Sequence, residues 1–381
     1  MHMADALLSP AVGGVMWGAT AATTVYCARK VRNDLDESKI PLMGVAGAFV
    51  FAAQMLNFAI PATGSSGHLG GALILAILLG PHAAFLVMAS ILTVQALFFA
   101  DGGLLALGAN IFNLGFFPAF IAYPYVYRKI VGDGASPSRG RVITGSLLAA
   151  VVGLQLGAFA VVLETTASGV SALPFSTFLL LMQPIHLAIG VVEGLVTAAV
   201  VLFVLRAQPE LLERTAARKP LAGLKLKPVL AGLGIAAVLA GGALAWFASS
   251  NADGLEWSIA KVTGTEEELE TASGTHDTAA DLQESIAILP DYGFREGEAA
   301  DDAAMPEPAG DAASDAAAGG AAAEASAGDA DGAAVEEEAA GWPAVDAGTS
   351  VSGIVGGLIV LGIAVALGFA LRRRSAARAE A

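Results

Sequence analysis

Long apolar stretches separated by short polar loops fill the first half of the chain and return near its end. Runs of about 20 apolar residues, long enough to cross a bilayer as helices, lie near 10–28, 40–60, 104–128, 143–164, 177–205, 229–249 and 351–371. Residues 69–100 are too long for one ordinary span, and Gly80-Pro81 interrupts them. Proline removes a helix hydrogen bond and restricts the residue before it. We therefore expect two helices there, over 69–80 and 82–100.

Basic residues cluster in the loops between these runs, at 29–39, 128–141, 206–227 and 372–374. Basic loops belong on the cytoplasmic side of a membrane, and all four reach that side only if residues 69–100 cross twice. We therefore predict seven spans before Arg206 and two after it, with the N-terminus outside and the C-terminus cytoplasmic. The loops at 61–68, 165–176 and 250–350 would then lie outside.

Composition supports an all-α, polytopic helical membrane protein, because 55% of the 381 residues are hydrophobic and only 14% are charged. The formal net charge of −15 comes from one segment: residues 251–350 carry 24 acids, against only Lys261 and Arg295. Within it, residues 297–340 are rich in Ala, Gly, Asp and Glu. Such a sequence cannot bury enough apolar surface to fold, so we expect disorder there. The single Cys27 excludes an internal disulfide.

The first residues of the chain suggest metal chemistry. His2 is too large for removal of the initiator methionine, so we expect Met1 to keep a free amine. That amine, the His2 amide and the His2 imidazole can wrap one metal ion in fused chelate rings. Four planar nitrogens favour Ni(II) or Cu(II) over hard cations.

His68 is the best candidate for the fourth nitrogen. The predicted topology places it on the same outer face as His2, and the glycines around it permit close backbone approach. Ser65 and Ser66 could hydrogen-bond the second ring nitrogen of an imidazole and orient it. The sequence therefore predicts a site made of Met1, His2 and His68.

The other three histidines receive different interpretations. We expect His82, at the predicted inner end of the helix pair, to be interfacial. His186 and Glu193 lie two turns apart on one helix face, and we expect a helix–helix hydrogen bond there. His276 falls in the acidic outer segment, where we expect it to be solvated.

A metal site in a chain that is mostly membrane suggests a transition-metal carrier, and two alternatives to an ATP-driven carrier remain open. Gly64-Ser65-Ser66-Gly67 also matches the nucleophile pattern of rhomboid-type intramembrane serine proteases, with His186 as a possible base; replacing Ser66 by Ala would inactivate a protease but not a carrier. A secondary carrier without ATPases is the other alternative. The chain has no phosphate-binding loop of the Gly-x-x-x-x-Gly-Lys type, so ATP-driven transport would need a partner ATPase.

Several motifs resemble one family in combination. Met1-His2-Met3-Ala4-Asp5-Ala6-Leu7-Leu8-Ser9-Pro10 resembles the start of the CbiM/NikM proteins, and the match continues through 54–58, 64–71, 79–81, 95–99, 101–103, 107–113 and 186–194. Asp253-Gly254-Leu255-Glu256-Trp257 and Leu289-Pro290-Asp291-Tyr292-Gly293-Phe294 are similar to the small CbiN/NikN-type partner, although Ala252 replaces its usual proline.

The resemblance implies a substrate-binding component of an energy-coupling-factor importer for Ni(II) or Co(II), which are substrates and not catalytic cofactors. It implies a seven-helix bundle plus two further transmembrane helices. It divides the chain into a metal-binding membrane domain (1–206), a basic cytoplasmic linker (207–228) and a CbiN/NikN-like two-helix segment (229–381). It also implies a transmembrane coupling subunit and cytoplasmic ATPases as partners, with membrane lipid around them and no nucleic acid. The chain itself would not be an enzyme.

Overall fold

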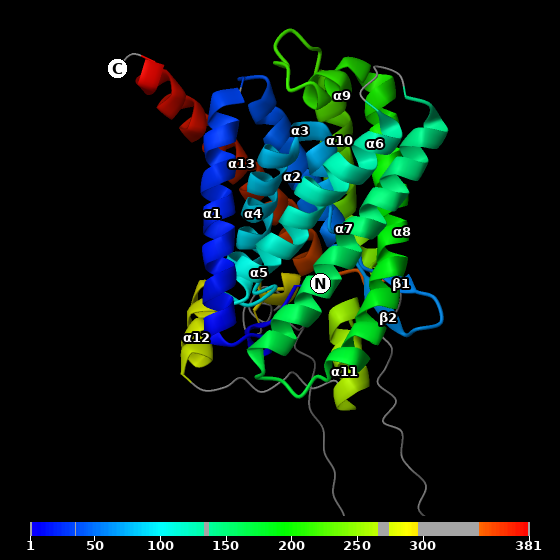
Figure 1. Ribbon diagram of the computed structural model, residues 1–381, viewed down its shortest axis with the longest axis vertical. Coiled ribbons are helices and arrows are strands. Elements are labelled where there is room, and N and C mark those ends of the chain that lie inside the picture. Colours follow the sequence, from blue (N-terminus) through cyan, green and yellow to red (C-terminus); the bar gives the residue numbers. More distant parts are fainter. Residues whose placement is uncertain (1, 35, 133–136, 266–273, 296–342, 380–381) are drawn as a thin grey trace, which may run out of the picture.

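The computed structural model describes residues 2–34, 36–132, 137–265, 274–295 and 343–379. Within these ranges the chain forms a bundle of helices (Figure 1). The helices are α1 (Pro10–Asp34), α2 (Lys39–Gln54), α3 (Ala72–Leu79), α4 (Pro81–Phe98), α5 (Leu107–Ile111), η2 (Phe112–Tyr127), α6 (Arg128–Val131), α7 (Arg139–Ser168), α8 (Phe175–Ala207), α9 (Pro209–Ala216), α10 (Lys227–Gly242), α11 (Gly254–Thr263), α12 (Thr275–Ile286) and α13 (Ala347–Ala379), with short 3₁₀ turns η1 (Asp5–Leu7), η3 (Leu244–Phe247) and η4 (Pro290–Tyr292).

Helices lie at each of the predicted spans, and the chain is a helical membrane protein. Among the described residues, four helical stretches are long and apolar enough to cross a membrane: Pro81–Phe98, Arg139–Ser168, Phe175–Ala207 and Ala347–Arg372. The predicted break at Gly80-Pro81 is present, since Gly80 has φ 81° and separates α3 from α4. All eight residues of α3 are buried, which shields this short helix from lipid.

The second helix ends earlier than predicted. α2 stops at Gln54, and the chain then forms a small antiparallel hairpin of β1 (Phe58–Ile60) and β2 (Ser65–Gly67). Phe58 pairs with Gly67 and Ile60 with Ser65. The expected span over 40–60 is therefore too long at its C-terminal end, because its last residues pair as a strand. The hairpin lies at the end of the bundle that also carries α11 and α12 (Figure 1).

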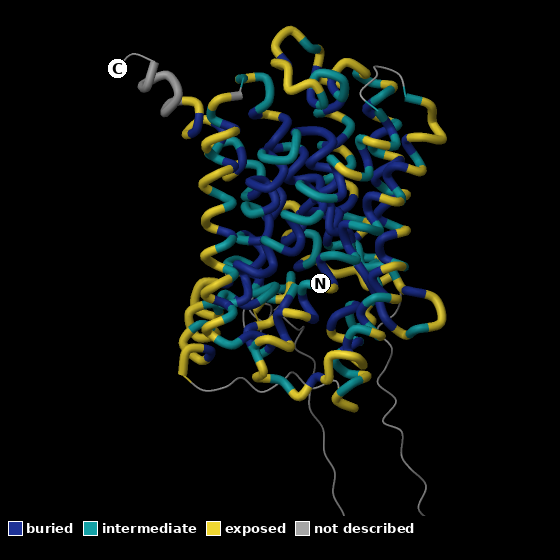
Figure 2. Tube along the Cα trace, in the orientation of Figure 1, coloured by how far each residue is buried: buried dark blue, intermediate teal, exposed yellow. Residues whose placement is uncertain are grey.

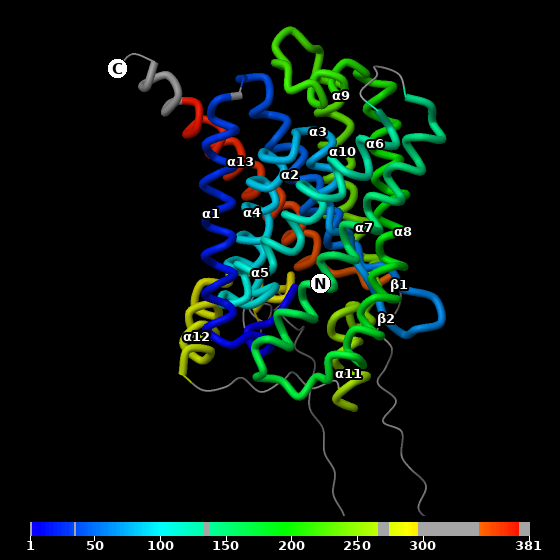
Figure 3. The backbone as a smooth tube through the Cα atoms, viewed as in Figure 1, coloured from blue at the N-terminus to red at the C-terminus, as the bar shows by residue number. Residues whose placement is uncertain are grey.

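The C-terminal helices are part of the bundle rather than appended to it. α10 and α13 both pack against α2, as the backbone trace shows (Figure 3). α10 and α13 also touch each other through glycines: a Cβ on Gly353 would lie 2.3 Å from the Gly241 carbonyl oxygen. Small residues let helix backbones approach this closely in membranes.

Exposure follows the pattern of a protein surrounded by lipid. The interior of the bundle is buried, while the outer faces of helices such as α1 and α8 are exposed (Figure 2). Many of these exposed side chains are large and apolar, among them Val15, Leu180, Leu195, Ile235 and Leu358. A soluble protein rarely exposes so much apolar surface.

Candidate metal centre

His2 and His68 lie side by side. Their rings stack with centroids 5.1 Å apart and an interplanar angle of 22°. Met1, the third residue of the predicted site, lies outside the described residues. Among the described residues no three His, Cys, Asp or Glu side chains converge in metal-binding geometry. A site that uses main-chain nitrogens requires only these two imidazoles.

Hydrogen bonds fix the start of the chain on the loop before α5 and on α5 itself. The Met3 N–H donates to Asn110 Oδ1 (2.8 Å), and Asn110 Nδ2 donates back to the Met3 carbonyl (3.1 Å). The Gly103 N–H also donates to the Met3 carbonyl (3.0 Å). Two residues later, Asp5 Oδ1 accepts from the Ala106 N–H (2.8 Å). These bonds hold His2 in one place although it is almost terminal.

Glu193 on α8 positions His68. Its two carboxylate oxygens accept from the Gly70 N–H (2.8 Å) and the Gly71 N–H (3.2 Å). Gly71 has φ 79°, and a Cβ there would lie 2.4 Å from a Val50 methyl group, so the turn requires glycine. The loop that carries His68 is therefore fastened to a spanning helix. The sequence places Glu193 on one helix face with His186 and predicts a helix–helix hydrogen bond, but the bonds of Glu193 in the structure go to this glycine turn.

The tautomer and the charge of the His68 ring are set by its surroundings. Its Nδ1–H donates to the Leu69 carbonyl (3.1 Å), which leaves the lone pair on Nε2. Burial lowers the pKa of His68 to about 3, so the ring is neutral at physiological pH. Neutral imidazole is the form that ligates metals.

Asp101 and Tyr292 hold the other imidazole. Asp101 Oδ1 lies 2.7 Å from His2 Nδ1, and Asp101 Oδ2 accepts from the Tyr292 hydroxyl (2.5 Å). Burial raises the pKa of Asp101, but His2 and both hydrogen bonds outweigh it, so that the pKa lies below its ordinary value. The Tyr292 ring stacks on Phe99 at 4.9 Å. We call this chain of contacts, from His2 through Asp101 to Tyr292, the clasp.

The clasp matters for chelation. Only Nδ1 of a histidine closes a six-membered ring with a metal bound to the same residue's amide nitrogen, because Nε2 lies too far away. In the structure Nδ1 of His2 faces Asp101, while Nε2 is buried and has no hydrogen-bond partner among the described residues. A chelated ion would therefore have to replace Asp101 at Nδ1.

A further carboxylate, this one from the C-terminal part of the chain, approaches His68. Asp253 caps α11 by accepting from the Leu255 N–H (2.7 Å) and the Glu256 N–H (2.9 Å). Its Oδ2 lies 3.9 Å from His68 Nε2. Sequence reasoning did not select Asp101, Asp253 or Tyr292. All three lie in motifs that it had matched, but the motifs alone did not place them near a histidine.

The two serines have a role that differs from the predicted one. Ser65 Oγ donates to the Ser66 carbonyl (3.1 Å), and Ser66 Oγ donates to the Asn251 carbonyl (2.8 Å). The Ser66 N–H also donates to the Ala252 carbonyl (2.8 Å). Ser66 thus joins the hairpin to the segment before α11, and Ser65 bonds within the hairpin; neither hydroxyl orients an imidazole in these contacts. Because the Ser66 hydroxyl is committed to a backbone carbonyl, these contacts do not support a nucleophile.

His186 lies beside a small cavity of about 10 Å³ next to His68, roughly the space one water needs. The cavity is lined by Gly67, His68, Gly70, Leu114, Leu154, His186, Ile189, Asp253 and Gly254. We predicted that His186 bonds to another helix. Its Nδ1–H instead donates to the Met182 carbonyl of its own helix (2.8 Å), so the prediction is wrong for this nitrogen. Its Nε2 is buried and has no partner among the described residues.

The expectation that His276 is solvated is also wrong. Its side chain is buried, and Nε2–H donates to the Leu8 carbonyl (2.8 Å). The acidic composition of the segment concealed a packed helix: from α12, Gln283 Nε2 donates to the Ala96 carbonyl (2.9 Å) and the Gly102 carbonyl (2.7 Å). The acidic stretch 297–340, for which we expect disorder, lies outside the described residues.

Comparison with known proteins places this arrangement in a family. Residues 2–211 match the CbiM family, described as the cobalt uptake substrate-specific transmembrane region, and residues 227–373 match the PDGLE domain. The chain is 36% identical over 239 residues to the fused nickel transport protein NikMN of Rhodobacter capsulatus, covering 59% of this chain and 68% of that protein.

Two further comparisons each cover a little more than half of the chain. The cobalt transport protein CbiM of Sorangium cellulosum is 30% identical over 221 residues, covering 56% of this chain and 95% of that protein. A crystal structure of a truncated transition metal transporter is 31% identical, with a TM-score of 0.48, covering 54% of this chain and 99% of that one. Since the family match includes more than half of the residues, the chain belongs to the CbiM family and carries a PDGLE domain fused behind it.

Proposed function

We propose that this protein is the substrate-capture membrane component of an ATP-driven uptake transporter for Ni(II) or Co(II). The ion would bind in a planar site of four nitrogens: the Met1 amine, the His2 amide, His2 Nδ1 and His68 Nε2. The stacked pair of His2 and His68, 5.1 Å apart, carries the proposal. The names of the relatives, one a nickel and one a cobalt transport protein, agree with it.

The nitrogen ligands account for selectivity. Mg²⁺ and Ca²⁺ prefer oxygen ligands and octahedral or larger shells, which a planar set of amine, amide and imidazoles does not offer. Ni(II) and Co(II) accept nitrogen ligands. Binding would release protons from the amine and the amide, so affinity should rise with pH.

The fused C-terminal part would take part in capture. Tyr292 contacts Asp101, which holds His2, and Asp253 lies near His68. An ion that displaces Asp101 from His2 would also shift the carboxylate that accepts from the Tyr292 hydroxyl. We infer that the PDGLE domain senses whether the site is filled through the clasp.

The energy would come from partner subunits. The chain has no phosphate-binding loop of its own, so a transmembrane coupling subunit and cytoplasmic ATPases would drive reorientation and release. The site would face outward and the basic loops would face the cytoplasm, in keeping with their charge. Loading of membrane vesicles with and without the ATPases distinguishes this transporter from a secondary carrier.

An N-terminal extension tests the site most directly. Adding Gly-Ser before Met1 converts the amine into an amide and should abolish high-affinity metal binding by the purified full chain. The matched control carries the same two residues after Ala381 and should bind one ion per chain. Metal content after desalting gives the readout. Stoichiometric binding by the extended chain would refute the amine ligand.

A further inference from the structure

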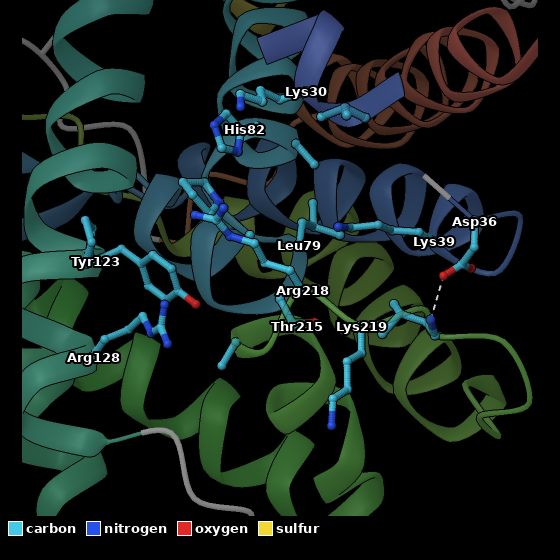
Figure 4. Close-up of a pocket in the computed structure, with 17 residues that line it drawn as sticks. Lys30, Asp36, Lys39, Leu79, His82, Tyr123, Arg128, Thr215, Arg218 and Lys219 are labelled. Atoms are coloured by element: carbon cyan, nitrogen blue, oxygen red, sulfur yellow. Dashed lines mark hydrogen bonds between the residues drawn. The ribbon is translucent and has the colours of Figure 1, made fainter. Parts of the chain in front are cut away.

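A basic pocket lies at the opposite end of the bundle from the histidine pair, and the function proposed above does not use it. Its volume is about 80 Å³. Five cationic side chains line it, together with one carboxylate and one histidine (Figure 4): Lys30, Lys39, Arg128, Arg218, Lys219, Asp36 and His82.

The cations converge from separate segments. Lys30 lies near the end of α1, Lys39 begins α2, and Arg128 begins α6. Arg218 and Lys219 follow α9. Lys39 and Arg128 are half-buried, whereas the other three are exposed at the rim. Charges that merely face the cytoplasm would be spread over a surface; here they meet at one cavity.

Among the described residues one acid, Asp36, lines the pocket beside these five cations. Asp36 accepts a hydrogen bond from the Leu221 N–H (2.5 Å), which ties the linker to the loop before α2. α4 begins in the pocket wall with Pro81 as its first residue. The N-terminus of a helix of 18 residues adds partial positive charge. The pocket therefore favours an anion.

Arg218 is held toward the pocket in a conformation that arginine rarely adopts. Its φ is 53°, in the left-handed region that favours glycine. The Arg218 N–H donates to the Thr215 carbonyl (3.1 Å) and the Lys219 N–H to the Arg214 carbonyl (2.8 Å), which closes α9 with the motif that normally ends in glycine. Figure 4 shows the Arg218 side chain extending into the pocket, while that of Lys219 points away.

Two exposed tyrosines mark the level of this end in a membrane. Tyr26 is 51% exposed and Tyr125 is 60% exposed. Lys30 Nζ lies 5.7 Å from the Tyr26 ring, and Lys129 Nζ lies 5.8 Å from the Tyr125 ring. Exposed tyrosines beside lysines are typical of the headgroup layer, where phosphate groups of lipids are abundant.

We propose that this pocket binds one phosphate group. The source is either the headgroup of an anionic phospholipid or free inorganic phosphate. Basic pockets between helices at the cytoplasmic face are suited to anionic headgroups. The anion would offset part of the charge of five converging cations and connect α1, α2, α4 and the linker after α9.

Replacement of Arg218 by Gly tests the proposal without endangering the fold. Glycine suits the positive φ, so the variant should be at least as stable as the wild type. Lys225→Gln is the matched control, because it removes one exposed cation of the same linker that does not line the pocket. Arg218→Lys keeps the charge and should restore binding.

Native mass spectrometry of the full chain in detergent measures retention of phosphatidylglycerol against phosphatidylcholine with the same acyl chains. A second arm titrates inorganic phosphate in lipid-free detergent. We expect Arg218→Gly to weaken binding about five-fold, the effect of one cation near an anionic headgroup, and Lys225→Gln to leave it unchanged. Retention of phosphatidylglycerol identifies the lipid source, and saturable phosphate binding identifies the free ion. Equal retention of both lipids without phosphate binding, or an unaltered Arg218→Gly variant, would overturn the proposal.

Discussion

The two ends of the bundle handle polar groups in opposite ways. At the histidine end three carboxylates contact defined partners: Glu193 holds two glycine amides, Asp101 holds His2 and Tyr292, and Asp253 caps a helix. At the basic end five cations share one opening with one acid among the described residues. Fixed partners at set distances suit a ligand recognised by coordination geometry, whereas a gathering of like charge suits one recognised by its charge.

The largest expected effect is on metal affinity, and it should differ between a histidine at each end of the bundle. His68→Ala should weaken Ni(II) binding by about 100-fold or more, since even indirect partners of a metal ligand are worth 10–100-fold. His82→Ala, at the basic end, removes the same side chain and should leave affinity unchanged. Isothermal titration of both variants provides the measurement. If the two variants lose affinity equally, the ends are not functionally distinct.

Glu193 should show how far the histidine end depends on its fixed partners. In Glu193→Gln one carboxylate oxygen becomes an NH₂ group that cannot accept from a glycine N–H, so the His68 loop loosens. We expect about ten-fold weaker metal binding, as for other groups that orient a ligand. Glu164→Gln is the control, because Glu164 accepts only from Asn113 Nδ2 (2.8 Å) in the described contacts. Unchanged metal affinity in Glu193→Gln would show that the loop needs no such anchor.

The clasp gives two effects of opposite sign. Asp101→Asn replaces a charged acceptor of His2 by a weaker neutral one, so the ion meets less competition and affinity should rise, up to about ten-fold. Tyr292→Phe removes a donor from Asp101 and strengthens its hold on His2, so affinity should fall by a smaller factor. Competition titrations with a chelator resolve both changes. A fall in affinity with Asp101→Asn would mean that Asp101 supports the metal-bound state instead.

The smallest expected effect is on how the stability of the folded protein depends on pH. The pKa of His68 is about 3 in the folded chain, whereas an ordinary histidine has a pKa of 6.5. Below about pH 6.5 the unfolded state therefore takes up a proton that the folded state does not. Stability of the metal-free protein should therefore decrease as pH falls, by at most about 1.4 kcal/mol per pH unit from this group. Thermal unfolding at pH 7 and pH 5 shows the decrease, and His68→Phe should reduce it. An identical pH dependence in that variant would contradict the assigned burial.

Apolar patterning predicted the helices well because a helix must have a minimum apolar length to cross a bilayer. Gly80-Pro81 marked the break between α3 and α4 because the proline ring removes a backbone N–H that a continuous helix would need. The same reasoning overlooked the hairpin at 58–67, whose glycine- and serine-rich sequence has no alternation. The side-by-side placement of His2 and His68 was expected from topology. Their metal role stays a prediction.

Contacts between distant segments were the part that could not be predicted. Glu193 reaches a glycine turn more than a hundred residues away, and His276 is buried against Leu8 although its neighbours in sequence are acidic. Tyr292 meets Asp101 only because α12 and η4 fold back on the loop after α4. Spacing within one helix carries no information on such partners, so they become visible only in three dimensions.

The short helix α3 joins these two ends directly. It begins after the glycine turn next to His68 and ends at Leu79, in the wall of the basic pocket. Eight residues rise only about 12 Å, against about 30 Å of hydrocarbon in a bilayer. Since all eight residues are buried, neighbouring helices and not lipid make up the rest of that thickness, and α3 links the histidine end to the basic end entirely within the protein.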